Sequence, residues 1–210
     1  MKSYVLSSGF YLQNTLTIAQ KLLGTFLVRI DEENQYERFS GKIVETEAYV
    51  GPSDLASHAH AGKTPRTQTM FEAGGIAYIY FIYGMYYCLN IVTGKKEYPA
   101  AVLIRAVEPV EGIEAMWGNR YGKSYPKGIS KTDKRFANLT NGPGKVCQAF
   151  EIDKTLNGAS LTGKTLFVED RGEKPGKIVS APRIGVDYAR QYKDKPWRFY
   201  VQDNLFVSKK

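Results

Sequence analysis

The sequence contains few of the features that mark secreted or membrane proteins. Its 210 residues include only two cysteines, Cys88 and Cys147, which lie far apart in the chain. This disfavours the disulfide scaffold of small secreted proteins. No stretch approaches the roughly 20 apolar residues of a membrane-spanning helix, and the opening MKSYVLSSGFYLQN lacks the apolar run of a signal peptide. We therefore expect a soluble, cytoplasmic protein without membrane contact.

Acidic residues are also outnumbered, by 29 Lys and Arg to 21 Asp and Glu, which gives a formal net charge of +8. A basic balance of this size suits a polyanionic partner such as nucleic acid, although it serves solubility equally well. Hydrophobic residues make up 43% of the chain and charged residues 24%, as in ordinary folded proteins. The length predicts one domain over residues 1–210.

The hydrophobic pattern predicts an α+β domain, with a mostly antiparallel sheet, a protruding β-hairpin and peripheral helices. A first helix follows Asn14 or Thr15 and stops at Gly24, and a second is expected to start at Pro109. Two short helices are expected near 133–139 and 143–151. Residues 51–69, with Gly, Pro, Ser and Thr, predict a long functional loop. Alternating or β-branched stretches predict strands at 25–30, 41–50, 76–83, 86–93, 99–109, 165–170, 178–186 and 197–201.

The stretch VETEAY, residues 44–49, carries two carboxylates on one strand. Side chains alternate along a strand, so Glu45, Glu47 and Tyr49 share one face. Carboxylates this close disfavour each other's charge, and a desolvated carboxylate can act as a general base. The strand by itself favours a simpler interpretation, in which the pair is a solvent-facing stripe on a sheet edge.

Tyrosines crowd the predicted hairpin YIYFIYGMYYCLNI, residues 78–91. Tyr83 lies beside Gly84 at the tip, where burial is difficult, and its ring suits a wedge between DNA bases. Tyr80 and Tyr49 suit two walls of a slot for a flat aromatic ligand. A basic protein with such a slot and wedge is expected to bind bases extruded from a duplex. The other hairpin tyrosines are expected to pack in the core with their hydroxyls partnered: Tyr78, Tyr86 and Tyr87.

Two polar residues interrupt the apolar strands. Asn90 lies between Leu89 and Ile91, and a buried amide there needs partners and can recognise a base edge. Arg105 is the one basic residue in AVLIRAVEP. A buried arginine needs an anion nearby, which Glu47 or a phosphate would supply. Both residues have a simpler alternative, in which they point outward to solvent.

Two sequence features have the composition of a metal site and of a phosphate-binding site. The H-x-H of His58 and His60, with a cysteine, has the composition of a metal site, but Cys88 and Cys147 fall in apolar core patterns, so no metal is expected. The segment NGPGKVCQAF places Gly-Pro-Gly-Lys at a helix start, which suits a phosphate or an ordinary helix equally well. The candidate contacts to a DNA backbone are Lys145, Arg66 and Arg198.

Seven motifs, in order, resemble the alkyladenine (3-methyladenine) DNA glycosylase family. They are VETEAY, SHA, TPR, YIYFIYGMYYCLNI, VLIRAVEP, NGPGKVCQA and KPWRFYV. The resemblance runs from about Leu16 to Val207. It implies a single mixed α/β domain with a protruding hairpin, no metal or organic cofactor, and double-stranded DNA with damaged purines as the partner. The short N-terminus resembles that of bacterial members. We expect a monomer in the bacterial cytoplasm, associated with the nucleoid.

The resemblance also implies roles for individual residues. Glu47 corresponds to the base that activates a water molecule, Arg105 to the arginine that helps hold that water, and Asn90 to the asparagine that obstructs the amino group of guanine. Tyr49, His58 and Tyr80 correspond to the side chains that contact the flipped base. Tyr83 corresponds to the tyrosine that intercalates in place of the extruded nucleotide.

The implied reaction is hydrolysis of the N-glycosidic bond without strand cleavage. No lysine of the motifs falls in the place of a Schiff-base nucleophile. Two other functions remain open from the residues themselves. One is a non-catalytic nucleic-acid-binding module that stacks bases on tyrosines. The other is a metal-dependent nuclease or deaminase, which the absence of an H-x-E with P-C-x-x-C pattern disfavours.

Overall fold

The computed structural model describes residues 3–32, 34, 37–82, 84–130 and 133–209. The described strands form one nine-stranded sheet in which every pairing is antiparallel. The predicted α+β class is therefore confirmed. The strands are β1 (Tyr4–Val5), β2 (Phe26–Asp31), β3 (Glu37–Tyr49), β4 (Ala77–Ile82), β5 (Tyr86–Thr93), β6 (Ala100–Glu111), β7 (Leu166–Asp170), β8 (Ile178–Ala181) and β9 (Arg198–Val201).

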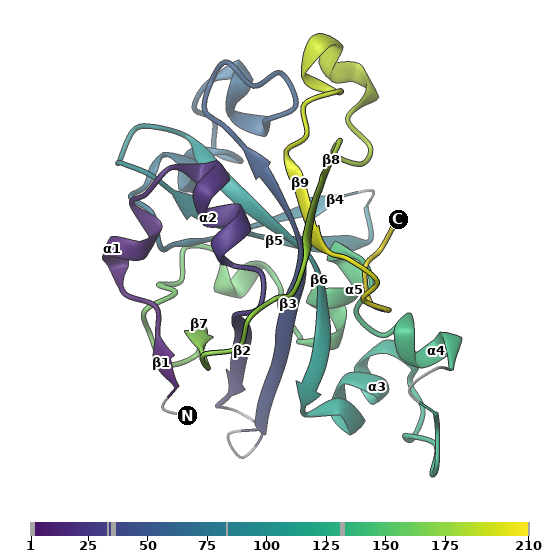
Figure 1. The fold of residues 1–210 in the computed structure, drawn as a ribbon. Helices are drawn as coiled ribbons and strands as arrows, with labels where there is room; N and C mark the ends of the chain where they lie inside the picture. Colours follow the sequence, from purple (N-terminus) through teal and green to yellow (C-terminus); the bar gives the residue numbers. More distant parts are fainter. Residues whose placement is uncertain (1–2, 33, 35–36, 83, 131–132, 210) are drawn as a thin grey trace.

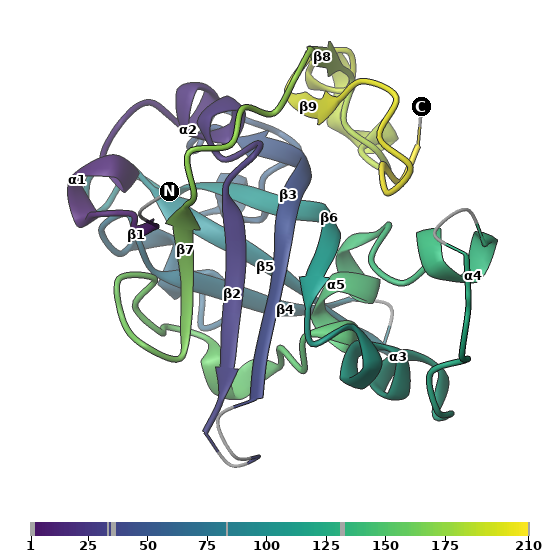
Figure 2. The ribbon, with the colours of Figure 1, turned by 60° about the horizontal axis from the view of Figure 1, so that its bottom comes forward.

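The helices are short and lie around this sheet (Figure 1). Figure 2 shows α3, α4 and α5 grouped on one side of the molecule, beyond β6. The helices are α1 (Ser8–Tyr11), α2 (Thr15–Lys21), α3 (Ile113–Tyr121), α4 (Lys134–Ala137) and α5 (Pro143–Ala149), with 3₁₀ helices η1 (His58–Ala61), η2 (Gln68–Phe71), η3 (Lys154–Leu156) and η4 (Asp187–Tyr192). The helix predicted after Asn14 is confirmed, because the Asn14 side chain accepts hydrogen bonds from the backbone N–H groups of Leu16 and Thr17.

Strand β3 is the centre of the sheet. The path of neighbouring strands is β1-β7-β2-β3-β6-β5-β4. The first part of β3 pairs with β2, and residues 45–47 pair with β9 on one side and β6 on the other. The pair Glu45 and Glu47 therefore lies in the interior of the sheet rather than on an edge.

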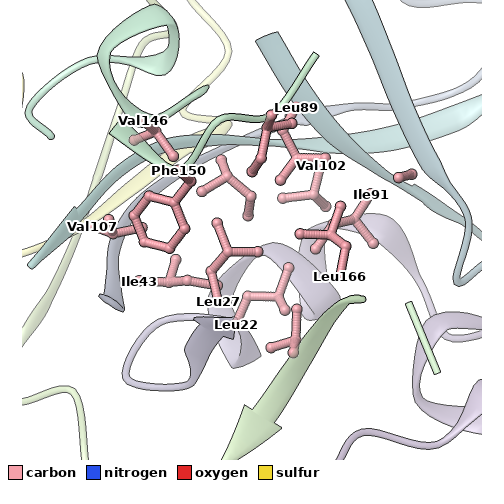
Figure 3. Packing of buried hydrophobic residues seen from close by; sticks show 14 of the residues in the cluster. Leu22, Leu27, Ile43, Leu89, Ile91, Val102, Val107, Val146, Phe150 and Leu166 are labelled. Carbon is pink, nitrogen blue, oxygen red and sulfur yellow. The ribbon is translucent and has the colours of Figure 1, made fainter. Parts of the chain in front are cut away.

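The core lies between the sheet and the helices that cover it. Figure 3 shows Val146 and Phe150 from α5 and its end packed with side chains of β5 and β6. Phe150, Leu89 and Ile104 are fully buried. This packing fixes α5, and with it the segment that begins at Gly142, against the strands that carry Asn90 and Arg105.

The helix predicted to start at Pro109 is wrong. Pro109 lies within β6, opposite Gly41, where the register with β3 shifts. Proline is tolerated at such irregular places and where a strand has no partner on its other side, and β5 pairs only with the beginning of β6. The helix begins at Ile113, after Gly112 adopts a left-handed conformation with φ of 74°. The strand predicted at 178–186 is also shorter, and ends at Ala181.

Candidate active site

A pocket of about 480 Å³ opens beside the β4–β5 hairpin. Four segments far apart in the chain supply most of its lining. These are the end of β3 with the loop that follows, the β4–β5 hairpin, the turn before α5, and the connection from β8 to β9. Leu103 and Arg105 of β6, Met70 and Arg120 complete it. The functional residues expected from these segments are thus brought to one place, with the exceptions given below.

The carboxylate of Glu47 lies directly behind the pocket wall. It is fully buried, and its Oε1 accepts a hydrogen bond from the Ile184 N–H at 2.8 Å and lies 3.3 Å from Arg105 Nη1. Its Oε2 accepts a hydrogen bond from the Tyr49 hydroxyl at 3.0 Å. Tyr49 and Arg105 both line the pocket. The expected shared face of Glu45, Glu47 and Tyr49 is consistent with these contacts, whereas the alternative of a solvent-facing stripe is wrong.

Arg105 is buried between two carboxylates. Its side chain is 10% exposed, and Nε lies 3.4 Å from Glu45 Oε1. Burial alone would lower the pKa of this guanidinium, but the charges of Glu47 and Glu45 outweigh burial and raise the pKa. The expectation that Arg105 has an anion partner is confirmed, and that partner includes Glu47.

Aromatic rings form the walls of the pocket. The His58 ring meets the Tyr80 ring edge-on, with centroids 4.4 Å apart. His58 Nδ1 lies 3.3 Å from the Tyr78 hydroxyl. Burial, with a smaller contribution from the charge of Arg66, lowers the pKa of His58 to about 4. His58 is therefore neutral near pH 7 and offers one donor and one acceptor. Burial also raises the pKa of Tyr49, so its hydroxyl keeps its proton.

Asn90 lies on the floor of the pocket. It is 3% exposed and its Nδ2 donates to the Tyr78 carbonyl at 3.4 Å. The outward-facing alternative is therefore wrong for Asn90. Tyr78 is buried as expected, but Tyr86 is 43% exposed and lines the pocket, which corrects its expected core placement. Tyr83 lies outside the described residues.

Three basic side chains were expected to contact a DNA backbone, and they have different environments. Lys145 lines the pocket and donates to the side-chain oxygens of Asn141 at 2.7 Å and Asn138 at 3.1 Å. Arg66 is exposed, with its guanidinium 5.7 Å from the centroid of Tyr80. Lys145 is half-buried, and the contact of both residues with a phosphate stays a prediction.

Arg198 does not fit this expectation. It is 5% exposed, and its Nη1 donates to Glu45 Oε1 at 2.8 Å and to the Lys209 carbonyl at 2.7 Å. Its Nε donates to the Pro182 carbonyl. The guanidinium is occupied by partners within the protein, because β9 brings residue 198 opposite Glu47 in the sheet. The expected contact of Arg198 with a DNA backbone is therefore wrong.

A buried ion pair behind Tyr49 was not anticipated from the sequence. Arg183 donates to both oxygens of Asp54, at 2.6 and 2.8 Å, and both side chains are fully buried. The Arg183 guanidinium lies 4.8 Å from the centroid of the Tyr49 ring. Arg183 follows the apolar stretch IVSAP, so it carried the same signal that identified Arg105, a lone charge beside an apolar strand.

Within residues 3–32, 34, 37–82, 84–130 and 133–209, no three His, Cys, Asp or Glu side chains gather in a way that would hold a metal. Both cysteines are buried and free. In the same ranges, none of the helices has the length and apolar character required to cross a bilayer.

Comparison with known proteins gives one consistent result. A family model described as methylpurine-DNA glycosylase matches residues 9–205. A Desulfitobacterium hafniense protein, provisionally named 3-methyladenine DNA glycosylase, is 47% identical over 206 residues, which cover 98% of this chain and 98% of that protein. A Clostridium perfringens protein of the same provisional name is 48% identical over 209 residues, covering 98% and 99% of the two chains.

Proposed function

This chain belongs to the methylpurine-DNA glycosylase family, and from that premise we propose that it removes 3-methyladenine and other damaged purines from double-stranded DNA. The reaction is hydrolysis of the N-glycosidic bond, which leaves an abasic site for base-excision repair. The observation that carries the proposal is a buried carboxylate, Glu47, immediately behind a pocket walled by aromatic rings. We further propose that the protein acts as a monomer in the bacterial cytoplasm, associated with the nucleoid.

The first step of the proposed mechanism is extrusion of the damaged base into the pocket. Extrusion costs a few kcal/mol and less for a damaged or mispaired base, and Tyr83 would fill the gap in the stack. Tyr49 and Tyr80 would stack on the base, while neutral His58 offers a hydrogen bond to its edge. Bases made cationic by alkylation gain an additional cation–π attraction of roughly 0.5–2 kcal/mol.

The second step is attack of water on the sugar. Departure of a purine leaves positive charge on the sugar, as in glycoside hydrolysis. Glu47 would take the proton from the attacking water, and its negative charge would stabilise the cationic sugar, while Arg105 helps to hold the water. General-base help of this kind contributes about 10²–10⁴-fold. Because Tyr49 and Arg105 separate the carboxylate from the pocket, the proposal includes a small shift of one of these side chains when DNA binds.

Asn90 is proposed to limit the substrates. Its amide lies on the pocket floor, held toward the Tyr78 carbonyl, where it would clash with the exocyclic amino group of normal guanine. Hypoxanthine, ethenoadenine and 3-methyladenine lack an amino group at that position and are accepted. 7-Methylguanine keeps the amino group and binds less well, but its alkylated base leaves so readily that it is still excised.

We also propose that the enzyme lacks strand-cleaving activity. Lys145 is the one lysine among the described residues that line the pocket. Its ammonium group is held by two asparagine side chains at the entrance rather than beside Glu47. The sugar is therefore released by water and no covalent amine intermediate forms.

The test is an excision assay in EDTA on duplexes with a single hypoxanthine, ethenoadenine or 3-methyladenine, followed by alkali. Wild type should give breaks only after alkali, and Glu47→Gln, which keeps the size of the side chain, should give none. Borohydride should trap no protein–DNA adduct. Equal excision by the mutant would refute the role of Glu47. Intact strands on every substrate, with tight DNA binding by both proteins, would identify a non-catalytic binding module.

A further inference from the structure

A second carboxylate lies behind the pair of Glu47 and Arg105. Glu45 is fully buried, and one of its oxygens, Oε1, lies 2.8 Å from Arg198 Nη1 and 3.4 Å from Arg105 Nε. The four side chains form one continuous group, in the order Glu47, Arg105, Glu45 and Arg198. Two positive and two negative charges balance there, and Arg105, which is 10% exposed, is the member that reaches the pocket. Neither Glu45 nor Arg198 lines the pocket.

The segment after β9 closes this group from the outside. The Ser208 N–H donates to Glu45 Oε2 at 2.7 Å, and Arg105 Nη2 donates to Ser208 Oγ at 3.4 Å. The Lys209 carbonyl accepts from Arg198 Nη1. Two side chains anchor the segment, because Phe206 and Val207 are 5% and 6% exposed and pack with Val44, Ala106 and Phe136. Residues 206–209 lie beyond the part of the chain that the family model matches.

This arrangement constrains where the Arg105 guanidinium can lie. A guanidinium between two carboxylates is drawn to both, and it stays 3.3 Å from Glu47 Oε1 only while Glu45 holds its other side. Loss of the Glu45 charge would leave two buried guanidiniums facing one carboxylate. A buried ionic group with one partner removed rearranges or takes up water, because an uncompensated charge in the interior is costly.

We propose that Glu45, Arg198 and Ser208 are positioning residues for the Glu47–Arg105 pair, and that residues 206–209 are part of the active site. They touch neither the DNA nor the damaged base. Their effect is on the rate of the chemical step, because a catalytic pair displaced by about 1 Å can lose on the order of 10²-fold in rate. This inference rests on the proposed function, since it assigns Glu47 and Arg105 the roles given above.

The experiment is single-turnover excision of hypoxanthine from a duplex, with enzyme in excess, for wild type and Glu45→Gln. The substitution keeps the size of the side chain and removes its charge. We expect the rate constant to fall by roughly 10–100-fold while the dissociation constant for a duplex with an abasic site changes less than about threefold. A merely destabilised enzyme would instead keep the wild-type rate constant at saturating enzyme concentration and show only a lower Tm, because the folded molecules still outnumber the DNA.

The chain offers a matched control in Glu169. This carboxylate is 6% exposed and lies between Arg38 at 2.8 Å and Arg171 at 2.7 Å, but none of the three lines the pocket. Glu169→Gln therefore removes the same charge from a buried carboxylate that is likewise held by two arginines, and should keep the wild-type rate constant. Arg198→Lys, which preserves the positive charge, should retain more of the rate than Arg198→Met.

If Glu45→Gln does not fold, Ser208→Pro tests the same point, because it removes the N–H that donates to Glu45 and the hydroxyl that accepts from Arg105, and leaves every charge in place. We expect it to lower the rate constant by several-fold, again without weaker DNA binding. A wild-type rate constant in folded Glu45→Gln, or in folded Ser208→Pro, would overturn the inference, as would an equal loss in Glu169→Gln. Absence of excision by wild type on all three substrates would overturn the proposed function as well, so the two failures are distinguishable.

Discussion

The ion pair between Arg183 and Asp54 makes the most specific prediction about stability. Both side chains are fully buried, and Asp54 also accepts hydrogen bonds from the N–H groups of Val50 and Ala56. Arg183→Met keeps most of the apolar volume but leaves the Asp54 carboxylate buried without its cation. Breaking a buried pair in this way costs roughly 3–5 kcal/mol. For a chain of this length that corresponds to a fall in Tm of roughly 6–20 °C.

Calorimetry at pH 7 on single and double variants would test this reasoning. Arg183→Met combined with Asp54→Asn should be less destabilised than the sum of the two single variants, because the second change removes the charge that the first leaves unpaired. The control is Lys63→Met, since Lys63 and Glu97 form an exposed pair at 3.2 Å, which should contribute less than about 1 kcal/mol. A loss in Arg183→Met no larger than in Lys63→Met would refute the argument, as would strict additivity in the double variant.

Three further outcomes follow from the pocket. Because burial lowers the pKa of His58 from 6.5 to about 4, the unfolded chain binds more protons between these values. The free energy of unfolding should fall as the pH drops from 7 to 5, by up to roughly 2 kcal/mol. Urea titrations of His58→Gln should not show this pH-dependent loss. Gly144→Ala would place a Cβ 3.0 Å from the Tyr86 side chain, so fluorescence anisotropy should show weaker binding of lesion DNA at an unchanged Tm. Lys145→Ala should reduce the slope of log affinity against log salt by about 1, and an unchanged slope would exclude a phosphate contact.

Local pattern predicted most of the strands and marked the polar residues of the site as candidates, whereas their roles came from the family resemblance. Alternation along residues 44–49 was enough to place Glu45 and Glu47 on one face, and a lone charge in an apolar strand was enough to identify Arg105. These signals are local because side-chain direction in a strand depends only on position along it. The hairpin was also predicted from local pattern, because two apolar, strand-like stretches meet at Gly84.

The predictions that were wrong, and the ion pair that was not predicted, depend on contacts between residues far apart in the chain. Arg198 and Glu45 are 153 positions apart, and Arg183 and Asp54 are 129. No local pattern says whether an arginine in a strand faces a carboxylate or a phosphate. The helix start predicted at Pro109 was wrong for a related reason. A proline at a helix start and a proline opposite a register shift in a sheet look the same in the sequence.

The charge behind Tyr49 leads to a last prediction, about the choice between cationic and neutral bases. Arg183 is buried and does not line the pocket, so it covers the ring face turned away from the pocket, 4.8 Å from the centroid. A cationic purine stacked on the other face would lie roughly 8 Å from this guanidinium. At that distance an unpaired charge would repel it by about 2 kcal/mol at an effective dielectric constant of about 20.

Asp54 cancels most of this repulsion, because its two oxygens lie 2.6 and 2.8 Å from the guanidinium nitrogens. Asp54→Asn keeps the acceptor for the backbone but leaves the charge of Arg183 uncompensated. The single-turnover rate on 7-methylguanine should therefore fall relative to that on hypoxanthine by up to about thirtyfold, measured at a temperature where the variant is folded. Equal losses on the two bases would mean that the pair only holds Tyr49 in place, and that the preference for cationic bases is set entirely on the pocket side of the ring.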